Sequence, residues 1–192
     1  ISEQDIRDRN ERMSNKAHET VTKVEQPIER GISIPTDSVD EFMEQFVEGE
    51  DAEIPDESGH GSSGFSINGD TARHFSKVQY PEETSIVMRI EPNSNGGVRG
   101  LFIDGETDTS HEEGEIIRSS KSKAKVRKIE RVKQPNGKMV ITITLQEPDD
   151  LSEVVFKEEK EKEDILSKKY LEGPLNPKPQ KVVEHIDECI AI

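Results

Sequence analysis

The sequence predicts an α+β fold, in which short β-strands and a few helices form one core and charged segments flank it at both ends. Strand patterns of alternating or β-branched residues recur, most clearly in 28–34, 84–90 and 139–145. Apolar residues three and four apart in 39–47 are typical of a helix. The hydrophobic content of 30% and the charged content of 35% indicate that part of the chain lies outside the packed core.

We expect three parts along the chain. Residues 1–24 carry a thin apolar stripe at helical spacing and predict an N-terminal helical arm. Residues 25–147 hold the strand patterns and form the domain. Residues 148–192 are dense in Glu and Lys and then in Pro, which indicates a charged C-terminal arm or linker.

Within the domain, the patterns give about six or seven short strands and one good helix. The helix covers 39–47, and a single helical turn is expected in 71–76, whereas 49–64 reads as a polar loop. The reverse-turn sequence Gln134-Pro135-Asn136-Gly137 predicts a hairpin. The expected strands are 28–34, 64–68, 84–90, 98–103 and 113–118, followed by the hairpin strands 121–132 and 139–145.

Charge and composition exclude several function classes. The net charge of −15 argues against broad binding of nucleic acid or of anionic membranes, because the field of the protein repels phosphate. The lone Cys189 excludes an internal disulfide and a cysteine-based zinc site. No apolar run approaches the roughly 20 residues of a membrane-spanning helix. The chain begins at Ile1, so we expect a processed form or a piece of a longer protein.

The pair of glutamates in His111-Glu-Glu-Gly-Glu-Ile-Ile-Arg118 is the candidate catalytic motif. Glu113 and Glu115 stand two residues apart where a loop enters a strand, so both carboxylates can face one cleft. Acid is abundant here, and Glu-x-Glu occurs elsewhere in the chain; this copy differs because an apolar strand follows it.

Two further motifs precede this pair, namely Arg30-Gly31 and Gly64-Phe65-Ser66. An arginine, then a serine strand, then Glu-x-Glu before a strand resembles the arginine–serine–glutamate class of mono-ADP-ribosyltransferases. The resemblance covers roughly residues 25–146 and is most similar to domains encoded by bacteriophages, which are often fused to head or portal proteins. It implies two packed short β-sheets with NAD bound in the cleft between them, and no metal.

The resemblance also implies roles for the cofactor-binding residues. Arg30, followed by Gly31, looks like the arginine that holds the phosphates or the adjacent ribose of NAD, for which a planar guanidinium is suited. Ser66 looks like the serine whose hydroxyl fixes the catalytic glutamate, although Ser66-Ile67-Asn68 departs from the Ser-Thr-Ser pattern of the class. Phe65 precedes it as an aromatic does in the family, and Phe75 falls where an aromatic often lies against nicotinamide.

For the glutamates, the resemblance makes Glu115 the catalytic residue. Its carboxylate would stabilise the positive charge that grows on the ribose as the bond to nicotinamide breaks. Glu113 would face the incoming nucleophile and hold an arginine guanidinium, which it could help to deprotonate.

The sequence therefore predicts an NAD-dependent ADP-ribosyltransferase that modifies arginine side chains of a protein target. Phage head or portal subunits are further expected partners, with no nucleic acid and no membrane. We expect the chain to be associated with the virion and delivered to, or made in, the bacterial cytoplasm. The alternative is a virion structural or interaction module with the same fold and a non-functional site, which the degenerate Ser66-Ile67-Asn68 strand favours.

Overall fold

The computed structural model describes residues 1–56, 60–75, 81–103 and 114–151, without the side chains of Thr71, Arg73 and Phe75. Ten strands and four short or medium helices make up this part of the chain, so the predicted α+β class is confirmed. The helices are α1 (Glu3–Glu19), the 3₁₀ helix η1 (Thr36–Ser38), α2 (Val39–Met43) and α3 (Gly69–Phe75). The strands are β1 (Val21–Lys23), β2 (Ile28–Pro35), β3 (Asp51–Glu53), β4 (Ser62–Ser66), β5 (Glu83–Glu91), β6 (Gly97–Arg99), β7 (Leu101–Ile103), β8 (Glu115–Ser119), β9 (Lys123–Lys133) and β10 (Met139–Gln146).

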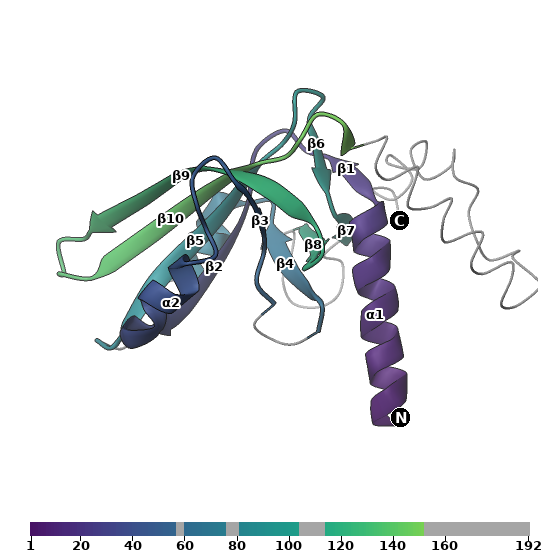
Figure 1. Cartoon of the computed structure of the whole chain (residues 1–192), viewed down its shortest axis with the longest axis horizontal. Helices are drawn as coiled ribbons and strands as arrows, with labels where there is room; N and C mark the ends of the chain where they lie inside the picture. Colours follow the sequence, from purple (N-terminus) through teal and green to yellow (C-terminus); the bar gives the residue numbers. More distant parts are fainter. Residues whose placement is uncertain (57–59, 76–80, 104–113, 152–192) are drawn as a thin grey trace, which may run out of the picture.

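Eight strands form one sheet in the order β3-β9-β10-β5-β2-β4-β8-β7, and β1 pairs with β6 in a second, two-stranded sheet. The large sheet is nearly divided in the middle, because β2 and β4 are joined by the single residue pair Glu29–Ser66. The halves β3-β9-β10-β5-β2 and β4-β8-β7 run in different directions (Figure 1). They correspond to the two short sheets that the sequence analysis expected.

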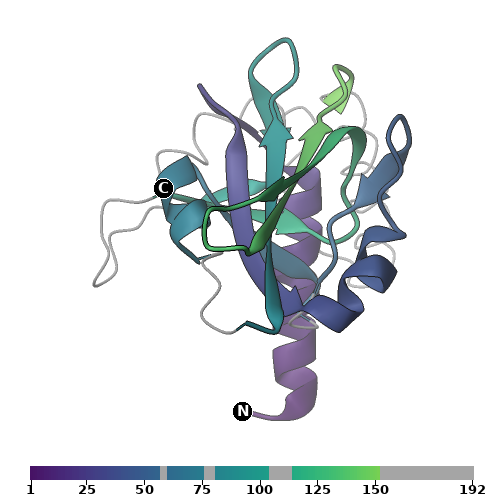
Figure 2. The ribbon, with the colours of Figure 1, turned by 90° about the vertical axis from the view of Figure 1, so that its left-hand side faces the viewer.

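Pairing in the sheet is antiparallel throughout except between β5 and β10, which run parallel. The long hairpin of β9 and β10 extends away from α1, which stands at the other end of the molecule (Figure 1). In the perpendicular view, α2 and α3 lie at opposite sides of β2 and β5 (Figure 2). The arrangement leaves β2, β4 and β8 side by side where the two halves of the sheet meet.

The hydrophobic core consists of the inward-facing side chains of these strands and of α2. Alternation explains its composition: in β10, Ile141, Ile143 and Leu145 are fully buried, as the predicted strand required. The described helix α2 is shorter than the expected 39–47, but Phe46 remains buried just beyond its end and stacks obliquely on Phe42 at 5.6 Å between ring centroids. Val39, Met43 and Phe46 are thus buried as the spacing predicted, whereas Val47 of the same predicted face is exposed.

The N-terminal segment differs from the expected arm. A capping box of Ser2 and Asp5 starts α1, as the side chain of each accepts a backbone N–H of the other. The second half of the helix packs on the domain: Ala17 is fully buried, and Ser14 Oγ lies 2.7 Å from Ser119 Oγ of β8. The following strand β1 pairs with β6, so residues 14–23 belong to the packed core.

Three other boundaries differ from the prediction. The expected loop 49–64 contains β3, which pairs with the start of β9. The expected strand 98–103 is divided at Gly100 into β6 and β7, which join different sheets. At the C-terminal boundary, Leu151 is buried, so the domain extends past residue 147; residues 152–192 lie outside the described part.

Candidate functional site

The predicted site residues Arg30, Ser66 and Glu115 lie on three adjacent strands, β2, β4 and β8. Ser66 is paired with Glu29 on one side and with Glu115 on the other. Ser66 therefore lies between Glu29, which precedes Arg30, and Glu115. In the sequence it is 36 residues from Arg30 and 49 residues from Glu115. The convergence of the three strands follows the order of motifs in the sequence.

Gly64 of β4 is the point at which Arg30 and Glu115 meet. The Nη1 of Arg30 donates a hydrogen bond to the Gly64 carbonyl at 3.0 Å. The carboxylate of Glu115 lies directly over the α-carbon of Gly64, since a β-carbon there would be 1.8 Å from its Oε1. Only a residue without a side chain leaves that space, so Gly64 permits the carboxylate to reach over the strand toward the arginine.

Neither charged group has all its hydrogen-bonding capacity used within the described residues. Nε of Arg30 is buried and has no hydrogen-bond partner there, and the Glu115 carboxylate accepts no hydrogen bond from those residues. Partial burial raises the pKa of Glu115, while the positive charge of Arg30 opposes the shift. Such a pair of incompletely satisfied charges on one surface is typical of a ligand site.

Ser66 makes local contacts instead of the contact that the resemblance implied. Its hydroxyl donates to the Asn68 carbonyl at 2.8 Å and accepts from the Asn68 N–H at 2.9 Å. The Oδ1 of Asn68 in turn accepts from the Asp70 N–H at 3.0 Å and starts α3. Ser66-Ile67-Asn68 therefore forms a turn, and this explains the departure from Ser-Thr-Ser: serine and asparagine are both used to direct the chain into α3.

The aromatic predictions have different outcomes. The side chain of Phe65 is fully buried in the core, opposite the buried Ile116 of β8. The prediction of Phe65 as a cofactor-contacting residue is therefore wrong for its side chain, because alternation turns it to the face opposite from Gly64 and Ser66. Phe75 is the last residue of α3, and its side chain lies outside the described part of the structure.

The remaining predicted residues are Gly31 and Glu113. Gly31 lies in β2 opposite Val87 of β5, next to Arg30. Glu113 and its neighbour His111 lie outside the described residues, whereas Gly114 is described and packs against Phe102. A β-carbon at Gly114 would come within 2.5 Å of the Phe102 ring, so the glycine between the two glutamates is required by packing.

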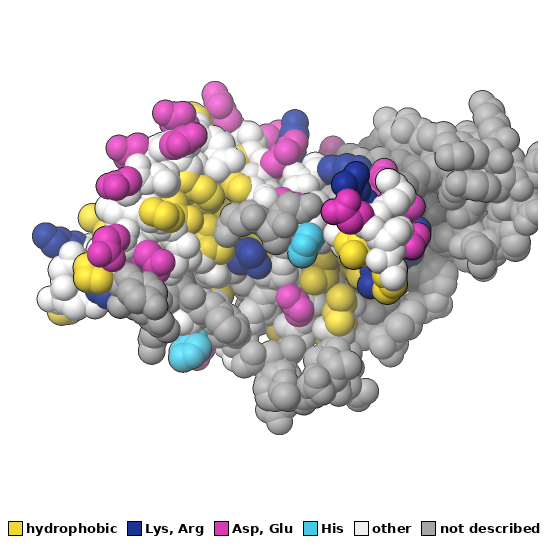
Figure 3. Space-filling model, turned by 90° about the horizontal axis from the view of Figure 1, so that it is seen from below, with side chains coloured by type: hydrophobic (Ala, Val, Ile, Leu, Met, Phe, Trp, Pro, Cys, Tyr) yellow, Lys and Arg dark blue, Asp and Glu magenta, His cyan; other side chains and the backbone are white. Residues whose placement is uncertain are grey.

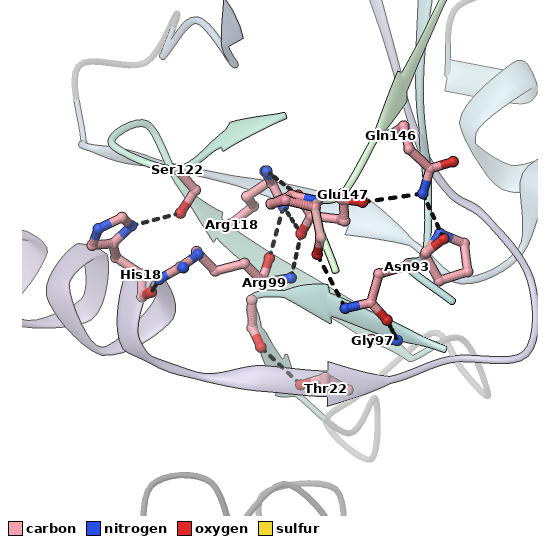
Figure 4. A network of polar contacts seen from close by, with 12 residues as sticks. His18, Thr22, Asn93, Gly97, Arg99, Arg118, Ser122, Gln146 and Glu147 are labelled. Carbon is pink, nitrogen blue, oxygen red and sulfur yellow. Dashed lines mark hydrogen bonds and ion pairs between the residues drawn. The ribbon is translucent and has the colours of Figure 1, made fainter. Parts of the chain in front are cut away.

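Sequence reasoning missed a second arginine–glutamate pair, between Arg118 of β8 and Glu147 just after β10, which is fully buried (Figure 4). Nη1 and Nη2 of Arg118 donate to the two carboxylate oxygens of Glu147 at 2.7 and 2.8 Å, and Nη1 also donates to the Arg99 carbonyl. The Arg99 N–H donates to the same carboxylate, and its guanidinium to the His18 carbonyl. Strand alternation could have indicated the burial of Arg118, because it lies two residues after the buried Ile116 and shares its face of β8.

The described helices include none long and apolar enough to cross a membrane. Within the described residues there is also no group of three or more His, Cys, Asp or Glu side chains that could hold a metal ion. The face in Figure 3 carries acidic side chains along one margin beside an apolar patch.

No protein-family model matches the chain, and no curated protein matches it. Among solved structures, the chain is similar to the Vis toxin, an ADP-ribosyltransferase from Vibrio splendidus, with 17% identity over 65% of this chain and a TM-score of 0.40. It is also similar to the C3larvin toxin from Paenibacillus larvae, with 10% identity over 76% of this chain and 72% of the other, and a TM-score of 0.42. A third is HopU1 of Pseudomonas syringae pv. tomato DC3000, with 19% identity over 62% of this chain and 45% of the other, and a TM-score of 0.41.

The chain spans about half the length of the Vis structure, 49%. All three of these proteins are ADP-ribosyltransferases. Because the identities are below 20% and the TM-scores are near 0.4, the chemistry of this chain has to be argued from its own residues.

Proposed function

We propose that this chain is an NAD-dependent mono-ADP-ribosyltransferase that modifies arginine side chains of a protein. The observation that carries the proposal is the meeting of Arg30 and Glu115 over Gly64. The first and last motifs of an arginine–serine–glutamate sequence thus supply a cation and a carboxylate to one place, on the strands that flank the serine strand.

The residues present fit NAD in charge and in hydrogen-bonding capacity. Nε of Arg30 is a buried donor without a partner among the described residues, and a guanidinium matches two phosphate oxygens at once. Bound NAD would supply a glycosidic bond from which nicotinamide leaves with the bonding electrons. Arg30 then holds the anionic part of the substrate, and its own position is fixed by the Gly64 carbonyl at 3.0 Å.

Glu115 supplies a negative charge where positive charge develops on the ribose. The residue as a whole is exposed, but its carboxylate is partly desolvated, and this desolvation raises its pKa. The positive charge of Arg30 opposes that rise of the Glu115 pKa. The two residues support one another in addition to contacting the substrate.

Glu113 is proposed as the residue that binds the acceptor arginine. A second carboxylate two positions before Glu115 can pair with a guanidinium and take the proton that its nitrogen loses when the new bond to ribose forms. The Vis toxin, to which this chain is similar, has been solved in complex with agmatine, a small molecule with a guanidinium group. We extend the proposal to a phage origin and a place in the virion by analogy with the phage-encoded members of the class.

A second candidate is an interaction module with the same fold and no turnover. The observation that favours it is the engagement of the Ser66 hydroxyl by the backbone of Asn68, which leaves that hydroxyl without a described bond to Glu115. Activity of the unmutated chain separates the two candidates.

The test is nicotinamide release from NAD, with and without agmatine, for the unmutated chain, Glu115→Ala and Glu113→Gln. We expect Glu115→Ala to abolish both activities, since one preorganised electrostatic group at a transition state contributes roughly 3 kcal/mol, or about a hundredfold. Glu113→Gln should suppress transfer to agmatine and spare much of the slow hydrolysis, in which water is the nucleophile. Equal losses in both activities for Glu113→Gln would contradict the division of roles, and an inactive unmutated chain would favour the interaction module. Transfer of labelled NAD to lysate proteins would then identify the target.

A further inference from the structure

A surface cavity of about 890 Å³ lies away from the Arg30–Glu115 site, at the place where the described chain ends. The residues after β10 form part of its wall and are held by hydrogen bonds from the loop after β5. Asn93 Nδ2 donates to the Pro148 carbonyl at 3.2 Å, and the N–H and Oγ of Ser94 both donate to Oδ1 of Asp149 at 2.9 Å. Leu151 lines the cavity and is only 1% exposed. The described chain therefore ends at this cavity.

The opposite wall of the cavity is basic. Lys121, Lys123 and Lys125 line it at the start of β9, and all three are exposed. Alternation places Lys123 and Lys125 on one face of β9, and Lys121 lies in the turn just before the strand. Within the described residues, the side chains of Lys123 and Lys125 make no hydrogen bond and no ion pair, and Nζ of Lys121 donates to Asn15 Oδ1 at 2.8 Å.

Three carboxylates also line the cavity, those of Asp51, Glu147 and Asp149. They leave the lysine cluster in excess, because Glu147 is already paired with Arg118. Asp149 is engaged by Ser94, and its hydrogen bonds to the Ser94 backbone and side chain lower its pKa. Asp51 stands opposite Lys125 in the pairing of β3 with β9. The wider surroundings are strongly basic, since residues 121–138 hold eight Lys and Arg and one Glu, a net charge of +7 in a chain of net charge −15.

The segment that follows Leu151 has the complementary chemistry. Residues 152–164 read Ser-Glu-Val-Val-Phe-Lys-Glu-Glu-Lys-Glu-Lys-Glu-Asp, with six acids and three lysines, hence a net charge of −3. An apolar triplet, 154–156, comes first and can follow Leu151 into the cavity, and the acids come next. A tether of a few residues also gives a binding segment an effective concentration of the order of millimolar, with which a free partner must compete.

We propose that residues 152–164 of this chain dock in the cavity, with the triplet 154–156 beside Leu151 and the acids against Lys121, Lys123 and Lys125. We propose an occupant from the same chain because this segment directly follows Leu151, which lines the cavity. Free anionic partners are disfavoured, because the net charge of −15 repels them. The docked segment neutralises the lysine cluster and covers the cavity.

The experiment is paramagnetic relaxation on the full chain. Cys189, the only cysteine, is changed to Ser, and Lys157→Cys carries a nitroxide, so that every acid of the segment is kept. We expect the amide signals of residues 121–125 to be broadened and those of the hairpin tip, 133–138, to be spared. The variant K121E/K123E/K125E should restore the signals of 121–125, and 0.5 M salt should weaken the broadening, because salt at this level screens charges beyond several ångströms.

The matched control is K128E/R131E/K133E, which makes the same charge change on the same strand outside the cavity and should leave the broadening in place. Broadening that is equal at the tip and at the cavity, or that survives K121E/K123E/K125E, would overturn the proposal. A mixture of spin-labelled and isotope-labelled chains gives the remaining control: broadening between molecules would assign the cavity to a second copy and would also overturn it.

Discussion

Strand β8 carries two charged residues that belong to two different arginine–glutamate pairs. Arg118 is fully buried, and its two Nη groups meet both carboxylate oxygens of Glu147 at 2.7 and 2.8 Å. Glu115, three residues earlier and on the opposite face, approaches Arg30 over Gly64 without any ion pair between them among the described contacts. The same two residue types thus give a closed pair at one end of the strand and an open pair at the other.

Nε is buried without a hydrogen-bond partner among the described residues in both arginines, so the pairs differ in the hydrogen bonds of their Nη groups and carboxylates. The Glu147 carboxylate receives both Arg118 and the Arg99 N–H, and the network ties β6, β8, the end of β10 and the end of α1 together. Arg30 donates one hydrogen bond, to the Gly64 carbonyl, and the Glu115 carboxylate accepts no hydrogen bond from the described residues. A closed pair stabilises the fold, and an open pair keeps donors and acceptors for a ligand.

The largest expected effect comes from breaking the closed pair. Glu147→Ala should lower the free energy of unfolding by about 3–5 kcal/mol, because it leaves the Arg118 charge buried without a partner. Urea unfolding measures it. The control is Glu91→Ala, which removes the half-buried partner of the exposed Arg127 at 2.8 Å and should cost less than about 1 kcal/mol. Similar losses for the two variants would refute the assignment of Arg118–Glu147 as the structural pair.

A smaller effect is expected from Gly64→Ala. The new β-carbon would lie 1.8 Å from Oε1 of Glu115, so the carboxylate must turn away while the strand itself stays in place. Stability should change little, since the displaced group is the end of a flexible side chain. NAD hydrolysis should fall by about a hundredfold, as expected when a catalytic group moves by about 1 Å. Unchanged hydrolysis in a folded Gly64→Ala variant would separate Glu115 from the chemistry.

The smallest effect concerns pH. Burial raises the pKa of Glu115 in the folded chain, so its protonated form is favoured by folding, and this contribution to stability is lost as pH rises through the raised pKa. Glu115→Gln should therefore melt at a slightly higher temperature than the unmutated chain at pH 7, and the gain should disappear below the pKa of a free glutamate. Melting curves between pH 3.5 and 7.5 measure it, with exposed Glu53→Gln as the control. A lower melting temperature for Glu115→Gln at pH 7 would show that the open pair is a net stabiliser.

Much of the fold could be predicted because alternation is a local property. The strands 28–34, 84–90 and 139–145 were found within one or two residues, as was the hairpin turn at Gln134–Gly137. The three-residue strands β1 and β3 were missed because so short a run has no period. The division at Gly100 was also missed, since it depends on a packing contact: a β-carbon there would lie 2.4 Å from Ile116 Cγ2.

For the site, the order of the motifs predicted which strands are adjacent, but it did not predict the side-chain contacts. Arg30, Ser66 and Glu115 were placed on adjacent strands from sequence order alone. The role of Gly64, the engagement of Ser66 by Asn68 and the burial of Phe65 depend on side-chain direction and on the turn into α3. Alternation with Ile116 puts Arg118 on the buried face of β8, but nothing in the sequence indicates that Glu147 is its partner.

The most direct test of the open pair as an NAD site is calorimetric titration of NAD into the intact chain, Arg30→Gln and Glu115→Gln. We predict that Arg30→Gln weakens NAD binding about ten- to hundredfold, because a charged hydrogen bond contributes about 1.5–3 kcal/mol. Glu115→Gln should bind NAD with similar affinity and fail to turn it over, and Arg127→Gln should behave as the unmutated chain. Equal NAD affinity in the unmutated chain and in folded Arg30→Gln would contradict the account.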